Sequence, residues 1–157
     1  MDAYCVFDVG DRRVGLPMAN VREIIEQGDV TPVPVPLAPE FVRGLFNLRG
    51  QVVPFLDLAP FVGLDRSRSS SSAVGNRVLV VERGDFRFAT SGDQIYMLEV
   101  DPATFQPLAD AALFPALDAG AHTARGYFQV IHLDRLEACL GQAMKFGELA
   151  GGSAQST

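Results

Sequence analysis

Few side chains in this sequence have the types and the spacing that catalysis requires. His132 and Asp134 stand two residues apart at the end of a predicted strand, where a general base and its orienting acid can be drawn. No nucleophile accompanies them locally, and a strand histidine without such a partner is usually structural. We therefore expect His132 to be structural and the protein not to be an enzyme.

Metal and nucleotide sites lack their usual signatures. The two histidines, His122 and His132, and the two cysteines, Cys5 and Cys139, show no metal-ligand spacing. The motifs G-x-x-x-x-G-K-[ST], G-x-G-x-x-G and G-x-S-x-G are absent from the sequence. We expect no cofactor and no metal. Both cysteines are expected to be reduced, Cys5 as an inert buried thiol, with a disulfide between them as the alternative.

Composition suits a globular protein with a substantial core. The chain has 157 residues, of which 48% are hydrophobic, enough for one domain or two small subdomains that share a core. Its net charge of −6 has the wrong sign for a protein that binds the phosphate backbone of nucleic acids. We expect no nucleic-acid partner.

Targeting signals are not evident in the sequence. The first residues (MDAYCVFDVGDRR) are acidic and lack the continuous apolar core of a signal peptide. No window reaches the ~20 apolar residues that a membrane-spanning helix needs. We expect a cytoplasmic protein without direct membrane insertion.

The stretch from Val42 to Leu58 (VRGLFNLRGQVVPFLDL) predicts a β-hairpin. Two apolar runs of strand length flank Asn47, Arg49 and Gly50, a turn in which Asn and Gly tolerate positive φ. Pro54 cannot donate a ladder hydrogen bond, so its strand lies at an edge or is bulged there. Arg49 occupies the tip, and from spacing alone the simplest interpretation is an ordinary solvated turn residue.

Other local patterns predict short strands and a few helices. Strands are predicted at Tyr4–Val9, Arg13–Pro17, Arg77–Glu82, Phe86–Thr90, Ile95–Val100 and Gly126–Leu133. The i, i+3, i+4 spacing of Val21, Ile24 and Ile25 predicts a short helix that ends near Gly28. A second short helix is predicted within 109–117. Asp134 is predicted to cap a terminal helix whose inner face carries Leu136, Leu140 and Met144.

Two segments have the composition of connections. Thr31 to Pro39 contains four prolines, which favour an extended backbone; a stiff connection is the simplest interpretation, and a ligand for a proline-binding domain is the alternative. Asp65 to Asn76 is low in complexity and is expected to be a flexible loop. Short strands separated by turns favour closed or nearly closed β-barrels over a βαβ sheet.

Longer motifs carry a family resemblance. The pattern V-x-G-L-x-N-L-R-G-x-V-V-P-x-L-D-L, preceded by VGLPMANVREII and TPVPVP, resembles the central motif of the CheW family of bacterial chemotaxis coupling proteins. The resemblance extends from about Phe7 to Leu140. The closing YFQVIHLDRL matches well, but RFATSGDQIYML departs from the family's V-G-[LIV]-x-V-D-x-V, so the segment from Phe88 to Leu98 is divergent.

The resemblance implies a mainly β fold of two small SH3-like five-stranded barrels with a few short helices. One CheW-like domain would then span residues 3–146. Residues 147–157 are small and polar in composition and are expected to form a disordered tail. The resemblance also implies a non-catalytic adaptor that couples chemoreceptor cytoplasmic tips to the regulatory domain of a CheA-like histidine kinase, as a monomer recruited to membrane-associated arrays. A CheW-like module in another pathway, such as pilus motility or second-messenger control, is the alternative.

Site residues follow from the same resemblance. The residues that match the family's partner-facing side are Val21, Glu23, Arg43, Asn47, Leu48 and Arg49. The family keeps an acid and an arginine at the positions of Glu23 and Arg49. A guanidinium beside an apolar groove benefits from a bidentate carboxylate, so we expect these two side chains to meet.

Overall fold

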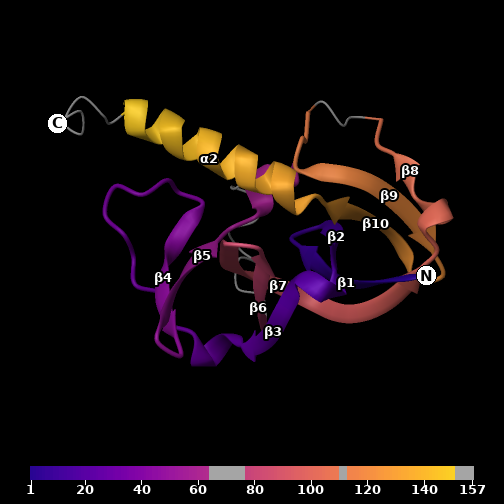
Figure 1. Ribbon diagram of the computed structural model, residues 1–157, viewed down its shortest axis with the longest axis horizontal. Coiled ribbons are helices and arrows are strands. Elements are labelled where there is room, and N and C mark those ends of the chain that lie inside the picture. The colour runs from indigo at the N-terminus through magenta and orange to yellow at the C-terminus, as the bar shows by residue number, and fades with distance from the viewer. Residues whose placement is uncertain (64–76, 110–112, 151–157) are drawn as a thin grey trace.

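The computed structural model describes residues 1–63, 77–109 and 113–150, with side chains up to residue 143 (Figure 1). The loop predicted at 65–76 and residues 151–157 of the predicted tail lie outside the described residues. The strands are β1 Asp2–Val9, β2 Arg12–Pro17, β3 Val21–Glu26, β4 Val42–Leu48, β5 Gln51–Leu56, β6 Arg77–Arg83, β7 Phe86–Val100, β8 Gln106–Pro107, β9 Leu117–Thr123 and β10 Gly126–Ile131. The helices are α2 Leu133–Ala150 and the 3-10 turns η1 Met18–Asn20, η2 Gln27–Asp29, η3 Ala59–Phe61 and η4 Pro102–Thr104.

Two curled sheets share one long strand, and the predicted mainly β class is confirmed. The first sheet has the order β3-β6-β7-β5-β4, and the second has the order β7-β1-β2-β10-β9-β8. Figure 1 shows β3–β6 in one lobe and β8–β10 in the other, with α2 running across the top of the view. Among the described residues, no ladder pairs β3 with β4, so the ladders alone do not close the first sheet.

Strand β7 is continuous where the sequence predicted two strands, Phe86–Thr90 and Ile95–Val100. The two ladders meet between the predicted strands, because β6 pairs as far as Gly92, opposite Arg77, and β1 pairs from Asp93, opposite Asp8. A Cβ on Gly92 would stand 2.7 Å from the Phe7 ring. The glycine therefore marks a close packing contact within the strand.

Strand β3 corrects the helix predicted from Val21, Ile24 and Ile25. It pairs with β6 from Val21↔Val81 to Glu26↔Arg77, and its exposure alternates with the period of two that a strand requires. The segment is rich in β-branched residues, which pack well on a pleated surface. Pairing with a strand far along the chain therefore overrides the local helical spacing.

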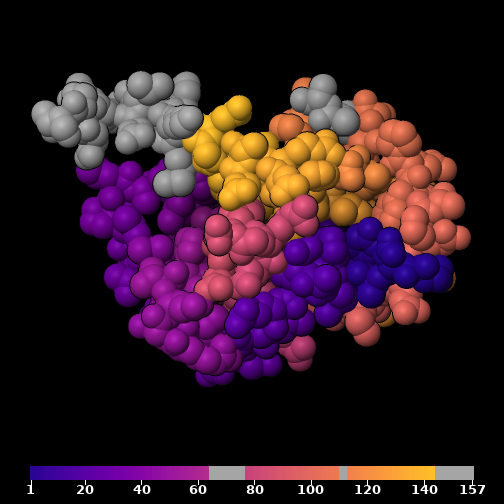
Figure 2. All heavy atoms as spheres, in the orientation of Figure 1, coloured from indigo at the N-terminus to yellow at the C-terminus, as the bar shows by residue number. Residues whose placement is uncertain are grey.

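Apolar side chains form three clusters. The first sheet encloses Val30, Phe46, Val53, Phe55, Val78, Val80 and Ala89, and the second encloses Val6, Val100, Ala121, Phe128 and Val130. A larger shared cluster joins residues of both sheets to Leu136 and Leu140 of α2. In the space-filling view, indigo N-terminal atoms lie against the pink atoms of β6 and β7, which agrees with the pairing of β1 and β3 with those strands (Figure 2).

The start of α2 differs from the prediction that Asp134 caps it. The backbone N–H of Arg135 donates to His132 Nδ1 at 3.3 Å, so His132 occupies the capping position. Asp134 lies in the first turn and accepts from Arg83 Nε of β6 at 2.7 Å. Leu136 and Leu140 are buried as predicted, while the side chain of Met144 lies outside the described residues.

The helix predicted within 109–117 is also absent from the described part of that segment. Leu113 to Ala116 form turns, and β9 begins at Leu117. Pro115 lacks the N–H that a helix needs, and the following residues pair with β10. Residues 110–112 lie outside the described residues.

The two cysteines are free thiols. Cys5 is fully buried in β1, and burial raises the pKa of its thiol to about 11. Cys139 is half-buried on α2, and desolvation likewise raises the pKa of its thiol. Both are therefore protonated at neutral pH, which suits packing rather than nucleophilic chemistry.

The proline-rich segment pairs with β4 through one isolated bridge. Val33 and Leu45 of β4 exchange two backbone hydrogen bonds, of 2.7 and 2.9 Å. Gly44 precedes Leu45, and a Cβ there would stand 2.7 Å from the carbonyl oxygen of Val33. The glycine of the V-x-G-L motif is thus required for this contact between two backbones.

Replacing this glycine should destabilise the fold. We expect Gly44→Ala to lower the free energy of unfolding by about 1–3 kcal/mol, because the added methyl group pushes the Val33 bridge apart. Gly28→Ala is the matched control: nothing lies within 4 Å of its Cβ position, and its effect should stay within about 0.5 kcal/mol. Urea unfolding followed by circular dichroism measures both, and equal midpoints would contradict the steric argument.

Candidate functional site

The β4–β5 hairpin presents Arg49 at its tip, as predicted. Leu48 pairs with Gln51, which leaves Arg49 and Gly50 as a two-residue turn with φ of 49° and 85°. Two successive positive φ values are typical of a type I′ hairpin turn. The side-chain oxygen of Asn47 accepts a hydrogen bond from the Gly50 N–H at 2.7 Å, which fixes the turn locally.

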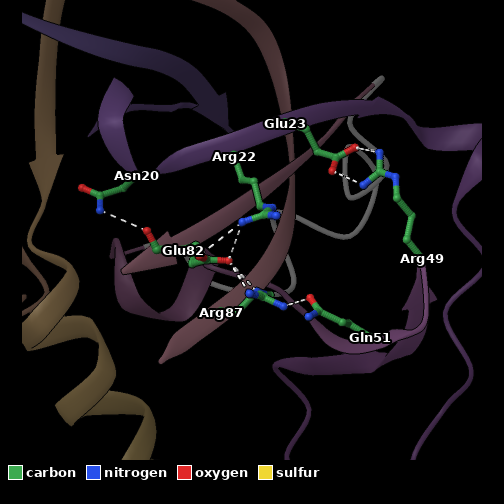
Figure 3. A network of polar contacts seen from close by, with 7 residues as sticks. All are labelled: Asn20, Arg22, Glu23, Arg49, Gln51, Glu82 and Arg87. Atoms are coloured by element: carbon green, nitrogen blue, oxygen red, sulfur yellow. Dashed lines mark hydrogen bonds and ion pairs between the residues drawn. The ribbon is translucent and has the colours of Figure 1, made fainter. Parts of the chain in front are cut away.

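Glu23 and Arg49 meet, which confirms the predicted pair. Arg49 Nη1 and Nη2 donate to the two carboxylate oxygens of Glu23 at 2.5 and 2.6 Å (Figure 3). The Arg49 side chain remains 69% exposed, while that of Glu23 is 22% exposed. Arg49 is therefore an oriented cation on the surface rather than a freely solvated turn residue.

The pair controls the ionisation of both groups. The hydrogen bonds from Arg49 lower the pKa of Glu23; burial opposes the shift, and the charges of Arg49 and Arg22 add to it. Conversely, the carboxylate of Glu23 raises the pKa of Arg49. Both residues are charged at neutral pH.

A second group of polar contacts, which sequence reasoning missed, lies beside this pair (Figure 3). Glu82 of β6 accepts from Arg87 of β7, at 2.7 Å from Nε and 2.5 Å from Nη2, and from Arg22 of β3 at 3.3 Å. Arg87 also donates to the side-chain oxygen of Gln51 on β5. Asn20 donates to the backbone carbonyl of Glu82 at 3.0 Å.

Strand periodicity explains why these groups gather at one end of the first sheet. On four strands, a polar residue lies two positions from an apolar one that belongs to the enclosed cluster or packs against it: Glu23 from Ile25, Gln51 from Val53, Glu82 from Val80, and Arg87 from Ala89. Side chains two apart share a face of the strand. The polar network therefore covers one end of the apolar interior.

A β-bulge brings Arg22 and Glu23 to the same side of β3. The register shifts between Val21↔Val81 and Glu23↔Val80, so Arg22 is the extra residue of the bulge. Without the bulge, two consecutive side chains would point to opposite faces. Figure 3 shows both projecting from β3 into the network. No local sequence signal marks this bulge.

The remaining predicted site residues divide into two groups. Leu48 is half-buried against the apolar cluster of the first sheet and adjoins the hairpin tip, whereas Val21 packs against the shared core. Arg43 lies at the other end of β4, where its Nη1 is 4.0 Å from a carboxylate oxygen of Asp57. The structure therefore gathers Glu23, Asn47, Leu48 and Arg49 and leaves Arg43 apart.

Exposed apolar residues lie on the elements that carry the pair. Ile24 of β3 is 40% exposed and Val52 of β5 is 66% exposed. Ile24 follows Glu23 directly on β3, so the two side chains point to opposite faces of the strand, and Ile24 does not extend the surface of the pair.

Neither histidine belongs to a reactive constellation in the described structure. His122 packs on the ring of Tyr127 at 4.6 Å between centroids, and His132 caps α2. Within residues 1–63, 77–109 and 113–150, no group of three or more His, Cys, Asp or Glu side chains is placed to hold a metal ion. Across the same part of the chain, no helix has the length and apolar character that crossing a bilayer demands.

Comparison with known proteins decides the family. A model of the CheW-like domain matches residues 3–137. The chain belongs to the CheW-like domain family. The crystal structure of the scaffolding protein TtCheW from Thermoanaerobacter tengcongensis has the same fold, with a TM-score of 0.70 over 84% of each chain and 23% sequence identity.

Curated relatives match over shorter segments. FrzA of Myxococcus xanthus is 42% identical over 65 residues, which cover 41% of this chain and 39% of FrzA. The chemotaxis protein CheW of Thermotoga maritima is 34% identical over 58 residues, or 37% of each chain. PilI of Pseudomonas aeruginosa is 31% identical over 120 residues, which cover 74% of this chain and 65% of PilI. The first two matches thus span well under half of those relatives.

The Glu23–Arg49 pair predicts a titration shift. Arg49→Ala should raise the pKa of Glu23 toward its usual value, because the hydrogen bonds that favour the carboxylate are lost. Since the folded-state pKa is depressed, the pair stabilises the fold above the usual glutamate pKa, and this contribution disappears as pH falls through the folded value. Carbon-detected NMR titration of the Glu23 carboxyl group measures the shift.

The matched control for this titration is Arg77→Ala. Arg77 of β6 pairs with Glu26 rather than Glu23. The Arg77→Ala variant should therefore leave the pKa of Glu23 unchanged. The same Glu23 pKa in the unaltered protein and in Arg49→Ala would contradict the assignment.

Proposed function

We propose that the protein is a non-catalytic adaptor that couples chemoreceptors to a CheA-type histidine kinase in bacterial chemosensory signalling. Membership of the CheW-like family supports this role. The observation that carries it is the Glu23–Arg49 pair, which holds a largely exposed guanidinium at a hairpin tip in one orientation. A scaffold needs such complementary surfaces and no reactive groups.

Preorganisation is the physical reason to assign the pair to docking. Exposed ion pairs contribute little to folding stability, so stability alone is a weak explanation for a bidentate contact across 26 residues of sequence. Ordering the tip before a partner arrives lowers the entropic cost of binding. We therefore assign Glu23, Asn47, Leu48 and Arg49 to the receptor-facing side. Val21, which packs against the shared core, and Arg43, at the other end of β4, lie apart from this group.

The signalling pathway in which the adaptor acts is a separate, more specific proposal. Relatives include proteins named chemotaxis protein CheW as well as FrzA and PilI. We propose chemotaxis first. The alternative is the same adaptor role in another chemosensory-type pathway, such as pilus motility or second-messenger control.

The proposed setting is the cytoplasm, at membrane-associated receptor arrays. Each contact with the receptor tip or the kinase regulatory domain would be weak, in the ~micromolar range. Multiple simultaneous contacts in an array would supply the overall strength. The isolated protein would then be a monomer.

Arg49→Ala tests the proposal. We expect several-fold weaker binding to the receptor cytoplasmic fragment, or weaker coupling to the kinase, with a melting temperature close to that of the unaltered protein. Glu23→Ala should have a milder effect, and the double variant should be less than additive because the two residues act as one unit. Isothermal titration calorimetry with receptor and kinase fragments from the same cell measures the affinity of each variant for each partner.

Arg77→Ala is the control for loss of an exposed arginine, because Arg77 is 53% exposed and lies outside the hairpin tip. Normal binding of both partners by Arg49→Ala would contradict the assignment of Arg49 to the docking site. Sedimentation analysis adds a separate check, since a stable dimer that buries Arg49 is incompatible with a receptor-facing tip.

A further inference from the structure

The polar network of Figure 3 has an unbalanced charge. It contains three arginines and two glutamates, so it carries one excess positive charge: Arg22, Arg49, Arg87, Glu23 and Glu82. The chain as a whole carries a net charge of −6. A local excess of positive charge on an acidic protein favours an acidic partner at that place.

Arg22 is the arginine that lacks a carboxylate of its own. Glu23 is occupied by both terminal nitrogens of Arg49, at 2.5 and 2.6 Å. Arg87 contacts Glu82 at 2.5 and 2.7 Å, whereas one nitrogen of Arg22 reaches both oxygens of Glu82 only at 3.3 Å. Arg22 therefore makes the longer contacts with Glu82, whose carboxylate is already paired with Arg87.

Arg22 is also more exposed to solvent than Arg87. The Arg22 side chain is 56% exposed and that of Arg87 is 27% exposed. The bulge in β3 directs Arg22 to the side that carries Glu23, next to the pair at the hairpin tip. If Arg22 turned away from Glu82, Arg87 would still hold the Oε2 atom of that carboxylate, and the Oε1 atom would lose only a contact of 3.3 Å. A new carboxylate partner for Arg22 would replace that long contact.

We propose that Arg22 is a specificity-determining residue of the docking surface, and that it pairs with a carboxylate on the receptor segment that docks beside Arg49. This inference rests on the proposed coupling function. A guanidinium and a carboxylate form directional, charge-assisted hydrogen bonds. A partner with a lysine or arginine at the same place would meet like charge, so Arg22 also rejects unsuitable partners.

Association kinetics with a receptor cytoplasmic fragment from the same cell test the proposal. Exposed charges at the rim of an interface act mainly on the association rate and its salt dependence. Arg22→Glu should lower the association rate at low salt by about three- to tenfold and flatten its salt dependence. Arg22→Ala should show a smaller loss, Arg22→Lys should retain most of the rate, and binding to the kinase regulatory domain should not change.

Arg77→Glu is the matched control. It makes the same change in net charge at a residue of similar exposure, 53%, which has its own carboxylate in Glu26 at 3.6 Å. Melting temperatures identify any variant that is misfolded, and Arg22→Ala is the conservative substitute if Arg22→Glu disturbs Glu23. A scan of acid-to-lysine changes in the receptor fragment should find one that restores binding to Arg22→Glu.

The outcomes separate this inference from the proposed function. Equal losses in Arg22→Glu and Arg77→Glu would show a general charge effect and overturn the role of Arg22. Unchanged receptor binding by the Arg22 variants would overturn it as well, with the coupling function intact. Failure of the unaltered protein to bind any receptor fragment would overturn both.

Discussion

Strand β7 (Phe86–Val100) is the constraint on which the architecture depends, because both sheets pair with it. The first sheet uses it up to Gly92, and the second begins pairing at Asp93, with no interruption between them. Gly92 permits this because a larger side chain would collide with the Phe7 ring at the crossing. The two sheets are therefore joined through a hydrogen-bonded strand rather than a flexible linker, which restricts how one can move against the other.

The same arrangement sets the chemistry at one end of the first sheet. Its strands place apolar side chains inside and, two residues further along the same face, polar ones at the end. Charged groups beside an apolar interior lose hydration, so pairing offsets the cost. Glu23 with Arg49 and Glu82 with Arg87 meet that need, and Arg22 is left with the longer contacts. Ion pairs within the protein therefore order this surface, while Arg22 remains able to bind a carboxylate of another protein.

Local sequence determined the elements whose contacts are local. The β4–β5 hairpin, its Asn47–Gly50 turn and Arg49 at the tip follow from turn chemistry and apolar runs within a few residues. The mainly β class follows from many short strands separated by turns. Glu23 was identified by the family motif, although its strand was predicted as a helix. The longest motif was thus sufficient to indicate the family and the pair.

Only the tertiary structure decided features that depend on distant partners. Val21, Ile24 and Ile25 fit a helix by spacing, but they form a strand because they pair with β6, and this pairing packs Ile25 against the apolar cluster of the first sheet. His132, rather than Asp134, caps α2 because the helix begins at Leu133, which leaves Asp134 inside the first turn, where it pairs with Arg83, 51 residues away. The contact of Arg22 with Glu82 spans 60 residues and depends on a bulge in β3. Such contacts leave no periodic trace in the sequence, since each is specified by the register of strands that are far apart along the chain.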